Sequence, residues 1–165
     1  CYAQTDWEAV EIQTQSITDN ISFLIGRGGN IGVIHSEEGI MIIDDQYAPL
    51  SHKIEAALMK LSESNLKFIV NTHYHGDHTG GNENLSINGA IIVAHENVKS
   101  RLSTPFYSTM WDREVEAKAK SFWPKVTFKE NMTFDFSGEE IEVIYTPAAH
   151  LEPRTNFVAA PSSGS

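Results

Sequence analysis

The sequence predicts an α/β (α+β) fold in which helices pack as a layer against a β-sheet. Two patterns support this fold class. Short apolar runs broken by glycine fill the first third of the chain, and later strand-like runs alternate with segments of helical periodicity. The length of 165 residues and the 41% hydrophobic content are typical of one globular domain with a sizeable core.

The first third of the chain is predicted to form strands. Four segments have the strand pattern: residues 10–14, 21–25, 31–35 and 40–43. Gly26, Gly28 and Gly29 lie between two of these runs and indicate a hairpin. The last run is apolar at every position, which is typical of a strand buried on both faces.

The remainder is predicted to alternate between helices and strands. A helix capped by Ser51 has apolar residues at helical spacing, and residues 113–120 carry Glu–Lys pairs four residues apart, which favours a second helix. A short helix is also expected after residue 94. Further strands are expected in five segments: residues 67–72, 90–94, 126–128, 132–136 and 141–145.

The charge of the chain narrows the range of partners. The formal net charge is −10, and because phosphate groups are bound by clustered Lys and Arg, nucleic acid and anionic membrane surfaces are disfavoured. There is no apolar stretch of membrane-spanning length.

The single cysteine, Cys1, excludes an intrachain disulfide. The opening residues 1–4 are compatible with the end of a secretory signal or with a lipidated cysteine, so an exported or periplasmic location and a cytoplasmic one both stay open.

A histidine-rich segment follows the strand expected at residues 67–72. His73 and His75 are two residues apart at the end of that strand, so they are expected to project to one side and hold one metal ion. Gly76 permits a sharp turn, after which Asp77 and His78 are expected to point in different directions, which suits two neighbouring metal sites better than one. Imidazole with one carboxylate is typical of zinc, and iron or manganese also fit. The alternative is a histidine-rich surface loop.

A helix is expected to start at Thr79, with its N-terminus able to hold an anionic group near the metal. A catalytic zinc takes three protein ligands and keeps a fourth position open. His150, which follows the strand expected at residues 141–145, is the candidate third ligand; its alternative is a capping or solvent-facing histidine.

Several other polar and aromatic residues have weaker assignments. Asp44 and Asp45 end a buried strand, where one of them could orient a metal-bound histidine or cap a turn. The aromatic group at residues 105–107 is interpreted as core packing, with a substrate wall as the alternative. The remaining isolated histidines are interpreted as surface or strand-end residues: His35, His52 and His95.

These residues resemble those of the metallo-β-lactamase superfamily. The resemblance extends from about residue 21 to residue 150 and is carried by Asn71-Thr72-His73-Tyr74-His75-Gly76-Asp77-His78-Thr79-Gly80-Gly81-Asn82 and, more weakly, by residues 145–150. It implies an αβ/βα sandwich with a metal site at the sheet edges. It assigns the ligands of a first metal, His73, His75 and His150, and those of a second, Asp77 and His78. The Asp77-His78 pair resembles the thioesterase type and one β-lactamase subclass.

The likeness weakens after His150. The family's bridging aspartate and final histidine have no counterpart after residues 151–157, so the second site would have two protein ligands. We therefore expect an incomplete single domain over residues 1–160, with the N-terminal half largely present, followed by a flexible tail at 161–165. An incomplete sandwich would expose apolar faces, which predicts self-association that light scattering would detect.

The predicted function is a zinc-dependent hydrolase with one or two ions. A metal-bound hydroxide would attack an acyl-type bond of a small-molecule substrate, namely a β-lactam, lactone or thioester. Asp77 is the predicted catalytic residue, orienting the hydroxide or accepting its proton. The alternative is a truncated, non-catalytic metal-binding relative of the same superfamily.

Overall fold

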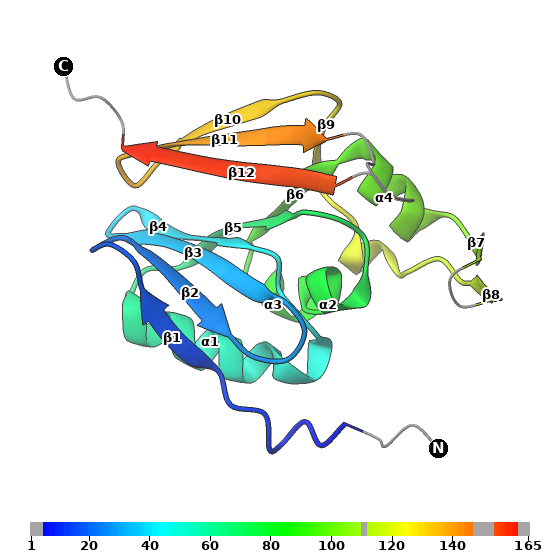
Figure 1. Ribbon diagram of the computed structural model, residues 1–165, viewed down its shortest axis with the longest axis horizontal. Coiled ribbons are helices and arrows are strands. Elements are labelled where there is room, and N and C mark those ends of the chain that lie inside the picture. The colour runs from blue at the N-terminus through cyan, green and yellow to red at the C-terminus, as the bar shows by residue number, and fades with distance from the viewer. Residues whose placement is uncertain (1–4, 110–111, 147–153, 162–165) are drawn as a thin grey trace.

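Two β-sheets and a layer of helices make up most of the molecule, and a short hairpin lies at one end of it (Figure 1). The computed structural model describes residues 5–109, 112–146 and 154–161. The larger sheet has seven strands in the order β1-β2-β3-β4-β5-β6-β9. Their bounds are β1 Gln13–Ser16, β2 Ile21–Ile25, β3 Asn30–Ser36, β4 Gly39–Ile43, β5 Leu66–Asn71, β6 Ile91–His95 and β9 Val126–Phe128.

The direction of pairing changes at β4. Strands β1 to β4 are antiparallel and are joined by short turns, whereas β4, β5, β6 and β9 are parallel neighbours. Parallel neighbours need a crossover, and the helical segments supply it. These are η1 Ala48–Leu50, α1 Ser51–Leu61, α2 Gly76–Thr79, α3 Asn82–Leu85, α4 Glu96–Ser103 and η2 Lys120–Phe122.

A second, smaller sheet covers part of the opposite face. It consists of the antiparallel strands β10 (Met132–Phe136), β11 (Glu139–Thr146) and β12 (Arg154–Pro161), in that order. The hairpin of β7 (Phe106–Ser108) and β8 (Arg113–Val115) lies beyond α4. The described layers are therefore helices, large sheet and small sheet.

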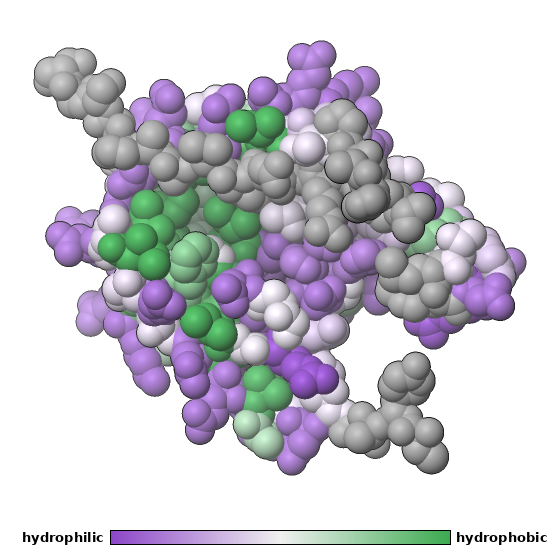
Figure 2. Space-filling model, viewed as in Figure 1, coloured by the Kyte–Doolittle hydropathy of each residue, from purple (hydrophilic) through white to green (hydrophobic). Residues whose placement is uncertain are grey.

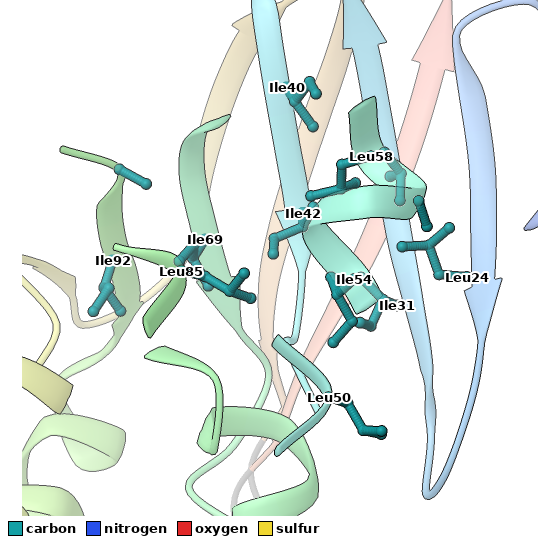
Figure 3. Close-up of a cluster of buried hydrophobic side chains, with 13 residues drawn as sticks. Leu24, Ile31, Ile40, Ile42, Leu50, Ile54, Leu58, Ile69, Leu85 and Ile92 are labelled. Atoms are coloured by element: carbon teal, nitrogen blue, oxygen red, sulfur yellow. The ribbon is translucent and has the colours of Figure 1, made fainter. Parts of the chain in front are cut away.

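Alternate residues of the central strands serve two separate cores. Ile40 and Ile42 of β4 lie in the core beneath α1, together with Ile54 of that helix, and Figure 3 shows this cluster. Met41, between the two isoleucines, lies in the core shared with the small sheet. Because both faces are covered, β4 is apolar at every position after its first residue, which confirms the interpretation of residues 40–43.

The second core is more aromatic and more open than the first. Phe68 of β5 contacts Phe134 and Phe136 of β10 edge to face, with ring centroids 5.6 and 5.8 Å apart. At its margin, Ile21 is only partly buried and Phe23 is 40% exposed. Figure 2 shows apolar residues gathered along the seam between the sheets. The self-association expected from such exposure stays a prediction.

The expected helix at residues 113–120 is wrong. Arg113–Val115 pairs with Phe106–Ser108 in the β7–β8 hairpin, and only Lys120–Phe122 makes a single 3-10 turn. An exposed Glu–Lys pair contributes about 0.2–0.5 kcal/mol to a helix, too little to compete with strand pairing. The expected cap is also displaced, because Ser51 is the first residue of α1 and its hydroxyl donates to Ala48 O.

The sequence patterns also miss β12. This strand pairs with β11 over its whole length, from Arg154 opposite Thr146 to Pro161 opposite Glu139. Pro161, expected in a flexible tail, ends the strand, while residues 162–165 and His150 lie outside the described residues. None of the helices in the described ranges has the length and apolar character needed to span a bilayer.

Candidate metal centre

The histidine segment lies where two parallel strands end. β5 ends at Asn71 and β4 at Ile43, and the Asp44 N–H donates to Val70 O, which ties the two strand ends together. The chain bends through residues 72–75 and enters α2 at Gly76. The helix expected from Thr79 thus begins three residues earlier, and it ends at Thr79 after one turn. Polar and ionisable side chains that follow both strands lie together at this edge. The carboxyl ends of parallel strands are where such sheets generally place their binding sites.

His73 and His75 form the first donor pair. His73 Nε2 and His75 Nδ1 are 3.1 Å apart, and His73 is buried. Two nitrogen ligands of a tetrahedral zinc, each at about 2.0–2.1 Å, would be about 3.3–3.4 Å apart. The separation of these two nitrogens is therefore close to that of two ligands sharing one ion, and metal binding by this pair stays a prediction.

Asp77 and His78 form a second pair. The expectation that they point apart is wrong, since Asp77 Oδ2 and His78 Nε2 are 3.4 Å from each other. The single turn of α2 brings the ends of these neighbouring side chains together. The two pairs are adjacent, because the rings of His73 and His78 have centroids 3.9 Å apart.

Asp44 supports both pairs from behind. Its Oδ2 accepts hydrogen bonds from the Thr72 hydroxyl and from His78 Nδ1, each at 2.7 Å, and its Oδ1 accepts from the Thr72 N–H at 2.7 Å. Because the Thr72 hydroxyl donates to Asp44, its oxygen can only accept from His73 Nδ1, 2.9 Å away. This network puts a proton on Nδ1 of His73 and of His78. The Nε2 atom of each ring then lies beside the second donor of its pair, His75 Nδ1 for His73 and Asp77 Oδ2 for His78.

The neighbouring Asp45 has a structural role. It is fully buried, its Oδ1 accepts from the Gly81 N–H at 2.9 Å, and its own N–H donates to His78 O at 3.2 Å. Burial raises the pKa of Asp45 well above its usual value; the Gly81 N–H opposes this shift, and the Asp44 charge adds to it. Asp44 therefore contacts a histidine ring, whereas Asp45 holds the backbone at Gly81, just before α3.

Two asparagines and two glycines complete the support of the site. Asn71 Nδ2 donates to His78 O at 3.0 Å, and Asn82 Nδ2 donates to Asn71 Oδ1 at 3.0 Å. A Cβ at Gly28 would lie 3.0 Å from the Asp77 Cβ, and one at Gly29 would lie 3.2 Å from His78 Cε1. The β2–β3 turn thus lies directly against the second pair. The asparagines flank the histidine motif, whereas the glycines had only indicated a hairpin.

The described residues supply donors in pairs only. In the part of the chain that the structure describes, no set of three or more His, Cys, Asp or Glu side chains is arranged to hold one ion. His150, the predicted third ligand, lies outside that part. Of the isolated histidines, His95 is buried, accepts from the Asn97 N–H at the start of α4 and stacks on Tyr145, so it belongs to the scaffold.

Comparison with known proteins agrees with this architecture. The family model described as "Metallo-beta-lactamase superfamily" matches residues 24–151. A metallo-beta-lactamase of Cronobacter sakazakii with a HARLDQ motif is similar in structure, with a TM-score of 0.77, 18% identity and coverage of 97% of this chain and 63% of that one. A subclass B3 metallo-beta-lactamase isolated from a soil metagenome library is also similar, with a TM-score of 0.74 and 20% identity. The match covers 97% of this chain and 62% of that one.

A subclass B3 metallo-beta-lactamase of Bradyrhizobium japonicum is similar as well, with a TM-score of 0.64, 21% identity and coverage of 92% of this chain and 63% of that one. This chain therefore spans less than two thirds of the length of these neighbours. At such identities the likeness establishes the fold, and the family model matches more than half of the chain. The chain belongs to the metallo-beta-lactamase superfamily.

Proposed function

We propose that this protein is a zinc-dependent hydrolase of acyl-type bonds, acting on a β-lactam, a lactone or a thioester. One observation carries the proposal: the hydrogen bonds of Asp44 and Thr72 orient the rings of His73 and His78, so that His73 Nε2 lies 3.1 Å from His75 Nδ1 and His78 Nε2 lies 3.4 Å from Asp77 Oδ2. A metal ligand is oriented in this way when its other ring nitrogen donates to a carboxylate or hydroxyl. Membership in a superfamily of metal-dependent hydrolases supports the same reading.

The donor set fits zinc. His73 Nε2 and His75 Nδ1 would hold the first ion, and His150 is proposed as its third ligand. Asp77 Oδ2 and His78 Nε2 would hold a second ion if one binds. Bound zinc lowers the pKa of a coordinated water and polarises the substrate's carbonyl oxygen. Iron or manganese would also be compatible with imidazole and carboxylate ligands.

The protein's own groups have separable tasks in this scheme. Asp77 Oδ2, beside His78 Nε2, would orient the attacking water and accept its proton. Asp44 carries no reacting atom and acts by fixing the ring of His78 through Nδ1. Thr72 transmits the same constraint to His73. Donors that are already oriented before the substrate binds avoid a reorganisation cost during the reaction.

Two measurements test the proposal. Native mass spectrometry of the purified protein would count bound zinc as zero, one or two ions per chain. A panel of chromogenic β-lactam, lactone, thioester and phosphodiester substrates with added zinc would then identify the bond that is cleaved. We expect zinc binding and turnover of at least one acyl substrate, both lost in His73→Ala and retained in His52→Ala, which alters an exposed histidine of α1.

The panel also separates the proposal from its alternative. Stoichiometric zinc with no turnover of any substrate would favour a non-catalytic metal-binding relative. Turnover of the phosphodiester alone would keep the hydrolase but overturn the acyl substrate class. Absence of zinc from a folded protein would overturn both functions.

A further inference from the structure

A cavity of about 190 Å³ opens beside the first donor pair. His75 and Gly76 form one wall, and the other walls come from α4, from Phe106 and from residues 113–118. Figure 1 shows α2, α4 and the β7–β8 hairpin on the same side of the molecule. Pockets that enclose a whole small ligand usually have about 300–1,000 Å³, so this volume suits one group of a larger substrate.

The charge of this cavity is opposite to that of the chain. Arg101, Arg113 and Lys118 line it together with a single carboxylate, that of Glu116. The protein as a whole has a net charge of −10, which repels anions from most of its surface. Three cations around one small cavity therefore create a local attraction for an anion, directly beside His75.

Arg101 is held in place by aromatic rings. Its guanidinium carbon lies 4.6 Å from the ring centroid of Phe106 and 5.8 Å from that of Tyr74. The Tyr74 ring in turn lies 4.7 Å from that of His75. Stacking on a ring restrains a guanidinium while leaving its N–H groups available for a bidentate contact with a carboxylate. Phe106 thus belongs to the cavity wall rather than to a core.

Lys118 is anchored to the same framework by its backbone. Its N–H donates to Leu102 O in α4 at 2.7 Å, and its carbonyl accepts from Trp123 Nε1 at 3.0 Å. Within the described residues, neither Arg101 nor Lys118 has a carboxylate partner. Two anchored cations without such a partner are prepared to bind an anion from solution.

We propose that this cavity is a recognition subsite for an anionic group of the substrate, a carboxylate in the first instance. The inference rests on the proposed function and narrows its substrate class. The substrate would be an acyl compound that also carries a carboxylate, placed to reach Arg101 while the scissile bond lies at the donor pairs. His75, which lies in a donor pair and in the cavity wall, connects the two sites.

A matched pair of substrates tests the subsite. Within the substrate class that the panel identifies, two chromogenic substrates would differ only at the far end of the acyl chain, with a carboxylate in one and a carboxamide in the other. We expect kcat/KM to be about 10-fold to 100-fold higher for the carboxylate, because charged hydrogen bonds discriminate on this scale. Arg101→Gln and Lys118→Gln should each reduce this ratio, chiefly by raising KM for the carboxylate substrate.

Two further variants serve as controls. Arg101→Lys keeps the charge and should retain part of the preference, whereas Lys99→Gln removes a cation of α4 outside the cavity lining and should leave the ratio unchanged. Equal kcat/KM for both substrates in the unaltered protein would overturn the subsite while the hydrolase proposal stands. A preference that survives in both Gln variants would do the same.

A binding measurement keeps the inference testable without turnover. Calorimetric titration of the zinc-loaded protein with succinate should give an affinity about 10-fold lower in Arg101→Gln than in the Lys99→Gln control. Because zinc is present in both proteins, its own attraction for succinate cancels in the comparison. Equal affinities would overturn the subsite. Much tighter binding of a single-stranded oligonucleotide than of succinate would point to a polyanion and would also overturn it.

Discussion

The two donor pairs differ in how they are held. Asp77 and His78 sit on one helical turn, with Asp44 bonded to His78 Nδ1 and the β2–β3 glycines packed against them. His73 and His75 lie in the bend before that helix, where His73 Nδ1 donates to the Thr72 hydroxyl and His73 Nε2 lies 3.1 Å from His75 Nδ1. The second pair is therefore bonded directly to Asp44 through His78, whereas the first pair is linked to Asp44 only through the Thr72 hydroxyl.

This difference suggests a division of labour. A pair of imidazoles, with His73 buried and His75 partly buried, suits an ion that must keep a position free for water. A pair that is backed by a carboxylate and crowded by glycine suits the precise placement of a proton acceptor such as Asp77. Substitutions that weaken one pair at a time, such as His73→Ala and Asp44→Asn, test whether the other pair is affected.

The largest effect is expected from removal of a donor of the first pair. His73→Ala should lower kcat/KM by about 1,000-fold or more, because the ion that activates water loses a ligand. Native mass spectrometry of the same sample should show the loss of one zinc, and His78→Ala should retain the ion of the first pair. An unchanged zinc count in His73→Ala would contradict the assignment of this pair.

Removal of metal should cost considerable stability. At a zinc concentration about 1,000 times Kd, binding contributes about 4 kcal/mol to the free energy of unfolding. For a domain of this size that corresponds to a decrease of roughly 10 °C in melting temperature on chelation. Calorimetry with and without EDTA would measure it. The melting temperature of His73→Ala should decrease less on addition of EDTA. If EDTA leaves the melting temperature of the unaltered protein unchanged, that result would count against a metal centre.

Loss of the carboxylate behind the second pair should have an intermediate effect. Asp44→Asn keeps the shape but loses the charge that orients His78 through Nδ1, and substitutions of this kind typically cost about 10-fold to 100-fold in metal affinity. Competition with a fluorescent chelator would show whether the weaker ion is the one of the second pair. Asp19→Asn, in an exposed turn, is the control; equal zinc affinity in both variants would show that Asp44 has no such role.

A smaller effect is expected from crowding the second pair. Gly28 has a φ of +94° and lies against Asp77, while Gly89 has a φ of +99° with nothing within 4 Å of an added Cβ. Alanine at either position should cost about 1 kcal/mol of stability through backbone strain, measured by urea unfolding. Only Gly28→Ala should also lower turnover, by a few-fold. Equal turnover of both variants would place the β2–β3 turn outside the site.

The smallest effect concerns a histidine outside both pairs. Partial burial lowers the pKa of His35 below its usual value of 6.5. The unfolded chain therefore takes up this proton first, so stability falls as the pH falls through 6.5 toward the lower pKa of the folded protein. In urea titrations of the metal-free protein, the free energy of unfolding should fall slightly less steeply with decreasing pH in His35→Gln than in the unaltered protein. An unaltered slope would mean that His35 contributes nothing.

Local patterns were enough to predict most of the fold. The apolar run at residues 40–43 became β4 because a strand covered on both faces needs apolar side chains at every position. Residues 132–136 and 126–128 became β10 and β9 with the expected bounds. The histidine motif also predicted that His73 and His75 project to one side, since spacing at a strand end is a local property of the chain.

Partners distant in the sequence could not be predicted in the same way. The strand at Arg113–Val115 exists because Phe106–Ser108 lies beside it, and β12 because β11 does. Asp44 accepts a hydrogen bond from His78, 34 residues further along the chain. Arg101 and Lys118 line the same cavity because α4 and the segment after β8 lie side by side there. Periodicity reports what each segment prefers by itself. The tertiary structure decides which preferences prevail and which charges meet, because strand pairing, desolvation and ion placement depend on neighbours that the local sequence does not contain.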